Sequence, residues 1–205
     1  KTLRGPRGGM ILSKGKPGNP FKEPEMTKEN IPTILDRSVF PGLQGGPHMN
    51  NIAAIAVALK EAMQPEFKIY AHQVIANAKA LAEELMNKGM KLVTDGTDNH
   101  MMVANTIVSF GIDGTAAEKT LEKAGITVNK QVIPDDPLPP YKPSGIRIGT
   151  PALTTRGMKE NEMKMIAEWI VEALKNSDKP EMLEQIHAQV KELTAQFPLY
   201  PELKY

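Results

Sequence analysis

Lys1-Thr-Leu-Arg-Gly-Pro-Arg-Gly-Gly9 opens the chain, and a second glycine-rich stretch follows at Phe40-Pro-Gly-Leu-Gln-Gly-Gly-Pro47. The first stretch combines a lysine with arginines and glycines, and no acidic residue occurs before Glu23. Glycine lets a backbone approach a ligand closely, and a lysine beside other cations can lose its proton and act as a nucleophile. The pattern indicates a flexible cationic segment that approaches an anion and carries an amine able to bond to a carbonyl group.

Length and composition are those of a globular chain and exclude several functional classes. The chain has 205 residues, 40% of them hydrophobic, a formal net charge of +1 and no cysteine. We therefore expect no nucleic-acid partner, no disulfide and no thiolate metal site. The four histidines are scattered without paired spacing, which predicts no metal site of another kind. No apolar run approaches the roughly 20 residues of a membrane helix, so we expect no membrane partner and a cytoplasmic location.

Apolar patterning divides the chain into two domains. Residues 52–59 are apolar on nearly all sides, which predicts a buried helix. A second helix begins at Pro65 and ends at Gly89, with apolar residues on one face only. We place the boundary where the enclosed helix gives way to the amphipathic one, which makes residues 1–63 one domain and residues 64–205 another.

The second domain mixes strands and helices. Thr115 and Glu118 have the spacing of a capping box at a helix start. The proline-rich stretch Pro134–Tyr141 predicts a rigid loop. Taken together, the pattern indicates an α+β or mixed α/β fold. The expected strands are 91–94, 101–108, 126–132 and 145–149, and the expected helices are 115–124, 163–174 and 183–197.

Two features of the pattern each allow a functional and a structural interpretation. Arg147 stands between Ile146 and Ile148, so strand alternation directs it to the face opposite two aliphatic side chains. An arginine there forms a structural ion pair or holds a bidentate carboxylate. Gly45 and Gly46 lie just before a predicted helix start, where their amides either bind a phosphate or form an ordinary turn.

Three ordered motifs resemble those of the serine hydroxymethyltransferase family. They are Lys1–Gly9, Phe40–His48 and the stretch Ser144-Gly-Ile-Arg-Ile-Gly-Thr-Pro-Ala152. The resemblance runs from Lys1 to about Phe197. It implies the end of a fold-type I pyridoxal-phosphate large domain followed by a small C-terminal α+β domain, in the C-terminal half of a longer enzyme that begins here at the cofactor lysine.

The resemblance also implies a reaction, and with it a set of site residues. In this family pyridoxal phosphate supports the interconversion of serine and glycine, and a one-carbon unit passes to tetrahydrofolate. The family's glycine pair binds the cofactor phosphate across a homodimer interface, and tetramers are common. The catalytic residue would be Lys1, the cofactor-binding residues Lys1, Arg7, Gly45 and Gly46, and the substrate-binding residues Arg147, Pro139, Pro140 and Tyr141.

Some features depart from the family pattern, and alternatives remain. Gln131 occupies a pterin-contacting position that often holds asparagine, which leaves the carrier as tetrahydrofolate or a related pterin. Several catalytic residues of the family precede the lysine, so we expect these 205 residues alone to be inactive. The alternatives are a non-enzymatic α/β module for anion binding or association, and another fold-type I enzyme such as a threonine aldolase.

Overall fold

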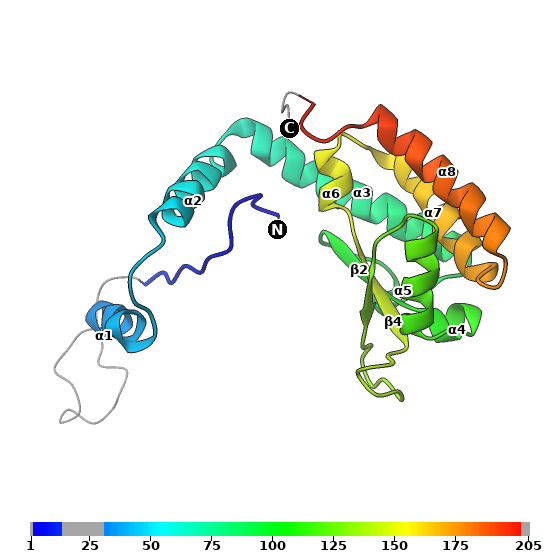
Figure 1. Cartoon of the computed structure of the whole chain (residues 1–205), viewed down its shortest axis with the longest axis horizontal. Coiled ribbons are helices and arrows are strands. Elements are labelled where there is room, and N and C mark those ends of the chain that lie inside the picture. Colours follow the sequence, from blue (N-terminus) through cyan, green and yellow to red (C-terminus); the bar gives the residue numbers. More distant parts are fainter. Residues whose placement is uncertain (1, 14–30, 202–205) are drawn as a thin grey trace. The chain divides into compact units, whose positions relative to one another are not determined.

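A computed structural model describes residues 2–13 and 31–201 (Figure 1). The chain divides into two compact units, Lys1–Phe67 and Lys68–Tyr205, here called the first and the second unit. The fold is mixed α/β, mostly helical with a small antiparallel sheet. In the described part of the chain, no helix has both the length and the apolar character needed to cross a bilayer.

The first unit consists of an extended segment and three helical elements. Residues 2–13 contain neither helix nor strand, and they are followed among the described residues by α1 (Ile31–Arg37), η1 (Ser38–Leu43) and α2 (Met49–Ala62). The segment approaches α2 through its glycines. A Cβ added at Gly5 would lie 2.8 Å from Ala58 Cβ, and one at Gly8 would lie 2.7 Å from Ile55 Cδ1. A larger residue at Gly5 would press against Ala58, whereas one at Gly8 would displace the end of the Ile55 side chain.

Helix α2 corrects one expectation from the sequence. Ala58 is its only buried residue, whereas the side chains of Ile52 and Val57 are 47% and 58% exposed. The expected burial of residues 52–59 is therefore wrong for the described part of this chain. The apolar pattern correctly predicts a helix, and the glycines of the N-terminal segment approach it at Ile55 and Ala58.

The second unit is a four-stranded antiparallel sheet with helices against one face. The strand order is β1-β2-β4-β3, and every neighbouring pair is antiparallel. Helix α5 packs against β3 and β4 on one side and against α7 and α8 on the other (Figure 1). The elements are α3 (Pro65–Asn87, which begins in the first unit), β1 (Lys91–Leu92), η2 (Val93–Asp95), β2 (Met101–Asn105), α4 (Thr106–Phe110), α5 (Gly114–Lys123), β3 (Asn129–Gln131), β4 (Gly145–Gly149), α6 (Pro151–Thr155), α7 (Glu160–Lys175) and α8 (Pro180–Gln196).

The core lies between the helices and the inner face of the sheet. Strand alternation places Ile146 and Ile148 of β4 on this face, where both are buried. The helical side of the core combines apolar residues at three- and four-residue spacing. Its fully buried members include Leu81, Leu85, Leu121, Met163, Ile170, Leu174 and Ile186.

A buried polar network holds the end of β4 and helix α6 against α3. The amide of Asn77, which is fully buried, donates hydrogen bonds to Thr154 Oγ1 and to the Met158 carbonyl, both at 2.9 Å. The Thr150 hydroxyl donates to the Val74 carbonyl, also at 2.9 Å. Because an unsatisfied buried amide costs about 1–3 kcal/mol, these partners hold the segment after β4 in one position.

Two local predictions for the second unit are wrong, each for a visible reason. The strand predicted to reach residue 108 ends at Asn105, whose side-chain oxygen accepts a hydrogen bond from Val108 N (3.0 Å) and caps α4. The capping box at Thr115 does not form, because Asp113 caps α5 by accepting from Thr115 N and Ala116 N. An aspartate two residues upstream offers a stronger cap than the threonine.

Candidate functional site

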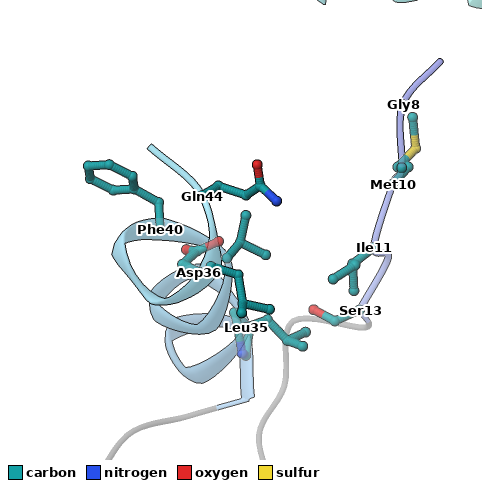
Figure 2. Close-up of a pocket in the computed structure, with 12 residues that line it drawn as sticks. Gly8, Met10, Ile11, Ser13, Leu35, Asp36, Phe40 and Gln44 are labelled. Atoms are coloured by element: carbon teal, nitrogen blue, oxygen red, sulfur yellow. The ribbon is translucent and has the colours of Figure 1, made fainter. Parts of the chain in front are cut away.

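The two glycine-rich motifs of the first unit meet at an open hollow of about 1060 Å³. Gly8 and Gly9 line it from the N-terminal segment, and Gln44 lines it from the end of η1. Figure 2 shows Ile11 pointing from the segment toward the helical side, where Asp36 and Gln44 lie. Among the described lining residues, the Asp36 carboxylate and the mostly apolar side chains do not favour a phosphate.

Gly45 and Gly46 lie beyond this hollow, and their surroundings fit a phosphate better. Both glycines are exposed, and a Cβ added to either would meet no atom within 4 Å among the described residues. Helix α2 begins shortly after them, and its N-cap His48 makes no side-chain capping hydrogen bond. The free amides at such a helix start, together with the positive end of the helix dipole, favour an anion.

The other residues predicted to bind the cofactor, Arg7 and Lys1, contribute less to the fit for a phosphate. Arg7 is exposed in the N-terminal segment and provides a cation accessible to solvent. Lys1, the predicted catalytic lysine, lies outside the residues that the structure describes. The fit of the first unit to a phosphate therefore rests on the glycine amides and the uncapped start of α2.

Arg147 occupies the centre of the sheet, on the face away from the core. It pairs with Val103 of β2 on one side and with Asn129 of β3 on the other. Its guanidinium Nη2 donates a hydrogen bond to Asn129 Oδ1 at 3.1 Å. Within the ranges 2–13 and 31–201, no acidic side chain forms an ion pair with Arg147. Strand alternation predicted this face correctly, and the structural ion pair finds no partner in the described residues.

The predicted rigid loop displays an aromatic ring while its backbone is held in place. The Tyr141 side chain is 77% exposed. Its carbonyl accepts hydrogen bonds from Lys130 Nζ (3.1 Å) and from Thr115 Oγ1 (3.3 Å). Pro139 is partly buried and Pro140 is exposed. The loop therefore presents Pro140 and Tyr141 to solvent from a backbone tied to β3 and to the start of α5.

The structure links Arg147 and Tyr141 through neighbouring residues of β3 without bringing the two side chains into contact. Asn129 binds the Arg147 guanidinium, and the next residue, Lys130, binds the Tyr141 carbonyl. Consecutive strand residues point to opposite faces of a sheet. Arg147 and the loop that carries Tyr141 are therefore both held by the edge strand β3, through side chains on its opposite faces.

Asp136 organises the loop before β4, and the sequence patterns did not reveal it. Its carboxylate accepts hydrogen bonds from Ile133 N (3.2 Å), Leu138 N (3.0 Å), Ser144 N (3.0 Å) and Ser144 Oγ (2.6 Å). Desolvation alone would raise the pKa of this carboxyl, but the hydrogen bonds from Ser144, Leu138 and Ile133 outweigh it and hold the pKa well below its usual range. The signal that was available is the Asp-Pro pair in a proline-rich stretch, since aspartate often caps the backbone two residues ahead in such turns.

Comparisons with known proteins agree with these motifs. The model of the family described as serine hydroxymethyltransferase matches residues 1–170. Proteins described as serine hydroxymethyltransferase are 51% identical over 202 residues in Koribacter versatilis, 52% over 204 in Acidobacterium capsulatum and 49% over 203 in Methanospirillum hungatei. These alignments cover 98%, 100% and 99% of this chain, but only 44%, 44% and 45% of the relatives. The chain thus spans less than half the length of the relatives it matches, and it belongs to the serine hydroxymethyltransferase family.

Proposed function

We propose that the full-length protein carrying this sequence interconverts serine and glycine with pyridoxal phosphate and transfers the one-carbon unit to tetrahydrofolate or a related pterin. Family membership supports the reaction, and the alignment covers nearly all of this chain. The activity belongs to the longer protein, because the chain corresponds to 44% of the first two relatives.

The observation that carries the proposal is the environment of Arg147. Its guanidinium faces away from the core, donates one hydrogen bond to Asn129 and has no acidic partner among the described residues. A guanidinium has five N–H donors in a planar fork that matches a carboxylate. We propose that Arg147 binds the carboxylate of serine or glycine and that Asn129 holds the plane of the fork.

The first unit supports a role in holding the cofactor. We propose that Lys1 binds pyridoxal phosphate covalently, that Gly45 and Gly46 bind its phosphate through their amides, and that Arg7 adds positive charge nearby. Pyridoxal phosphate supplies, when bound, an electron sink for the bonds at the α-carbon of an amino acid. The exposed glycines and the start of α2, whose N-cap residue His48 makes no side-chain capping hydrogen bond, support this assignment.

The loop of the second unit supports a role in binding the pterin. We propose that Pro139, Pro140 and Tyr141 form a wall against the carrier, because the exposed ring is displayed from a fixed backbone. We propose that the carrier is tetrahydrofolate or a related pterin. The choice between them stays open because Gln131 stands where the family often has asparagine. The Gln131 amide donates to the carbonyl of its neighbour Val132 at 3.1 Å.

We further propose a fold-type I architecture with residues 1–63 ending the large domain and residues 64–205 forming the small α+β domain. The division of the chain at Phe67 and Lys68 supports a boundary near this place. We propose that the enzyme is a homodimer or tetramer in the cytoplasm. A Cβ added at Gly45 or Gly46 would meet no atom of the described residues within 4 Å, which fits a site completed by a neighbouring subunit.

The test is an assay of the full-length protein with pyridoxal phosphate. Serine should yield glycine in the presence of tetrahydrofolate, and the one-carbon unit should appear on the carrier in equal amount. After borohydride reduction, peptide mapping should place the cofactor on Lys1. A label on another lysine would remove the role of Lys1, threonine cleavage without serine turnover would indicate an aldolase, and no cofactor binding at all would indicate the non-enzymatic module.

A further inference from the structure

A single carboxylate gathers both ends of the loop that precedes β4. Oδ1 of Asp136 accepts from Leu138 N and Ser144 Oγ, and Oδ2 accepts from Ile133 N and Ser144 N. The donors before and after it in the loop are Ile133 and Leu138. Ser144 directly precedes β4 and is 2% exposed. Four hydrogen bonds on one side chain therefore fix the path of the loop relative to the strand that carries Arg147.

The strand end does not depend on Asp136 alone. The Ser144 carbonyl accepts from Thr106 N (3.0 Å) and Thr106 Oγ1 (3.1 Å), which ties it to the start of α4. Arg147 itself lies in a central strand, paired on both sides. Apart from Asp136, the loop is held near its end, where the Tyr141 carbonyl accepts from Lys130 Nζ and Thr115 Oγ1 and the Pro143 carbonyl accepts from Gly114 N at 2.7 Å. We therefore expect the part of the loop before Tyr141, and not the strand, to move when the Asp136 hydrogen bonds are removed.

We propose that Asp136 is a positioning residue that sets the loop of Pro139, Pro140 and Tyr141 for the one-carbon carrier while leaving amino-acid binding at Arg147 unaffected. This inference rests on the proposed function and adds to it, because it assigns a residue to one of the two substrates. Asp136 need not touch either substrate. It acts through the backbone of the loop, whose other end is held separately by the bonds to the Tyr141 carbonyl.

The chemistry requires a carboxylate at this position and not merely a small polar side chain. Asparagine has the same shape, but it replaces one acceptor oxygen with an NH₂ group. With the NH₂ at the Oδ1 position, the Ser144 hydroxyl can turn to accept, but Leu138 N loses its acceptor. With the NH₂ at the Oδ2 position, both Ile133 N and Ser144 N lose theirs. Asp136→Asn thus removes at least one hydrogen bond in either orientation.

The experiment compares three variants of the full-length protein loaded with pyridoxal phosphate. Asp136→Asn removes the charge and at least one bond, Ser144→Ala removes only the hydroxyl bond, and Asp135→Asn removes the same charge from the adjacent exposed residue as a matched control. Serine and glycine binding is followed through the cofactor spectrum without the carrier. Tetrahydrofolate binding is measured by calorimetry in the presence of glycine, and KM for tetrahydrofolate is measured by turnover. A thermal melt of each variant reports on folding.

We expect Asp136→Asn to weaken tetrahydrofolate binding about tenfold, the effect of losing one or two hydrogen bonds, while serine affinity changes about twofold or less. Ser144→Ala should also weaken tetrahydrofolate binding, by a smaller factor. Asp135→Asn should bind both substrates as the wild type does. If Asp136→Asn does not fold, Ser144→Ala provides the test: its tetrahydrofolate binding should weaken while its serine binding stays close to that of the wild type.

Other outcomes overturn the inference in distinguishable ways. If Asp136→Asn weakens serine and tetrahydrofolate binding equally, Asp136 only supports the fold. The same follows if the variant has a lower melting temperature but binds both substrates normally. Normal carrier binding in a folded Asp136→Asn would exclude the role of Asp136 while the proposed function stands. A wild-type protein that binds neither serine nor tetrahydrofolate would remove the proposed function and this assignment with it.

Discussion

The guanidinium of Arg147 on β4 donates a hydrogen bond to the side-chain oxygen of Asn129 on β3, at 3.1 Å across the sheet. The bond uses one of the five N–H donors of the guanidinium, and no acidic side chain of the described residues forms an ion pair with it. Asn129 therefore orients the fork of Arg147 without neutralising its charge. This arrangement suits a positioned cation better than it suits an ion pair that stabilises the fold.

Asn129→Ala is expected to weaken serine and glycine binding in the full-length protein about two- to tenfold. The variant keeps Arg147 but loses one hydrogen bond of about 0.5–1.5 kcal/mol that orients it. Titration followed through the cofactor spectrum measures the effect. The melting temperature should change little, because Asn129 is exposed on an edge strand. Unchanged amino-acid binding would show that Arg147 does not need this support.

Gly145→Ala and Gly114→Ala are both expected to destabilise the protein by overpacking. A Cβ at Gly145 would lie 2.6 Å from the Ala104 carbonyl oxygen, and one at Gly114 would overlap the Gly145 carbonyl. Relieving such contacts costs about 1–3 kcal/mol, because backbone atoms must shift. Gly149→Ala in the same strand is the control, since its nearest neighbour, the His100 carbonyl oxygen, would be at 3.3 Å. Thermal melts that rank Gly149→Ala as the most damaging of the three would contradict this packing.

Gly46→Val is expected to weaken retention of pyridoxal phosphate in the full-length protein without lowering its melting temperature in the cofactor-free form. A Cβ added at Gly46 would meet no atom of the described chain within 4 Å, so we expect the valine to disturb mainly what binds to the amides from outside. Equilibrium dialysis of the cofactor and a melt of the apo protein measure the two effects. Wild-type cofactor affinity would favour an ordinary turn at this position.

Acid should remove the stabilisation that Asp136 contributes. Hydrogen bonds lower the pKa of this carboxyl in the folded state, so it contributes stability above its unfolded pKa of about 3.9 and loses that contribution as the pH falls toward the folded pKa. The gap in unfolding free energy between wild type and Asp136→Asn should therefore be constant from pH 7 to pH 5 and shrink below about pH 4. Denaturant titrations at pH 7, 5 and 3 check this. A gap that widens on acidification would show the opposite sign of the pKa shift.

Local pattern predicted the parts of the fold that depend on neighbours in sequence. The alternation of Ile146, Arg147 and Ile148 correctly predicted which side chains face the core. The capping of α5 was misassigned because Asp113 and Thr115 compete for the same amides, and sequence spacing alone does not rank them. The burial of α2 was overestimated because an apolar pattern shows that a helix packs against something, but not whether the described residues supply the packing partner.

Candidate site residues stand out in the sequence only where one residue type in a short motif carries the chemistry. Arg147 stands out as a charge between aliphatic residues. Asp136 does not, because its donors lie three residues before it and two and eight residues after it, and the loop path brings them together. The partnership of Lys130 with the Tyr141 carbonyl likewise spans eleven residues and follows from the pairing of β3 with β4.

A titration of full-length Arg147→Lys with serine and glycine, run beside a thermal melt, tests the central claim most directly. Lysine keeps the charge but loses the fork, so one charge-assisted hydrogen bond of about 1.5–3 kcal/mol is lost and both affinities should fall by roughly 10- to 150-fold. The cofactor absorbance without amino acid and the melting temperature should stay as in the wild type. Normal binding of serine and glycine together with a depressed melting temperature would contradict the account, because it would make Arg147 a structural residue.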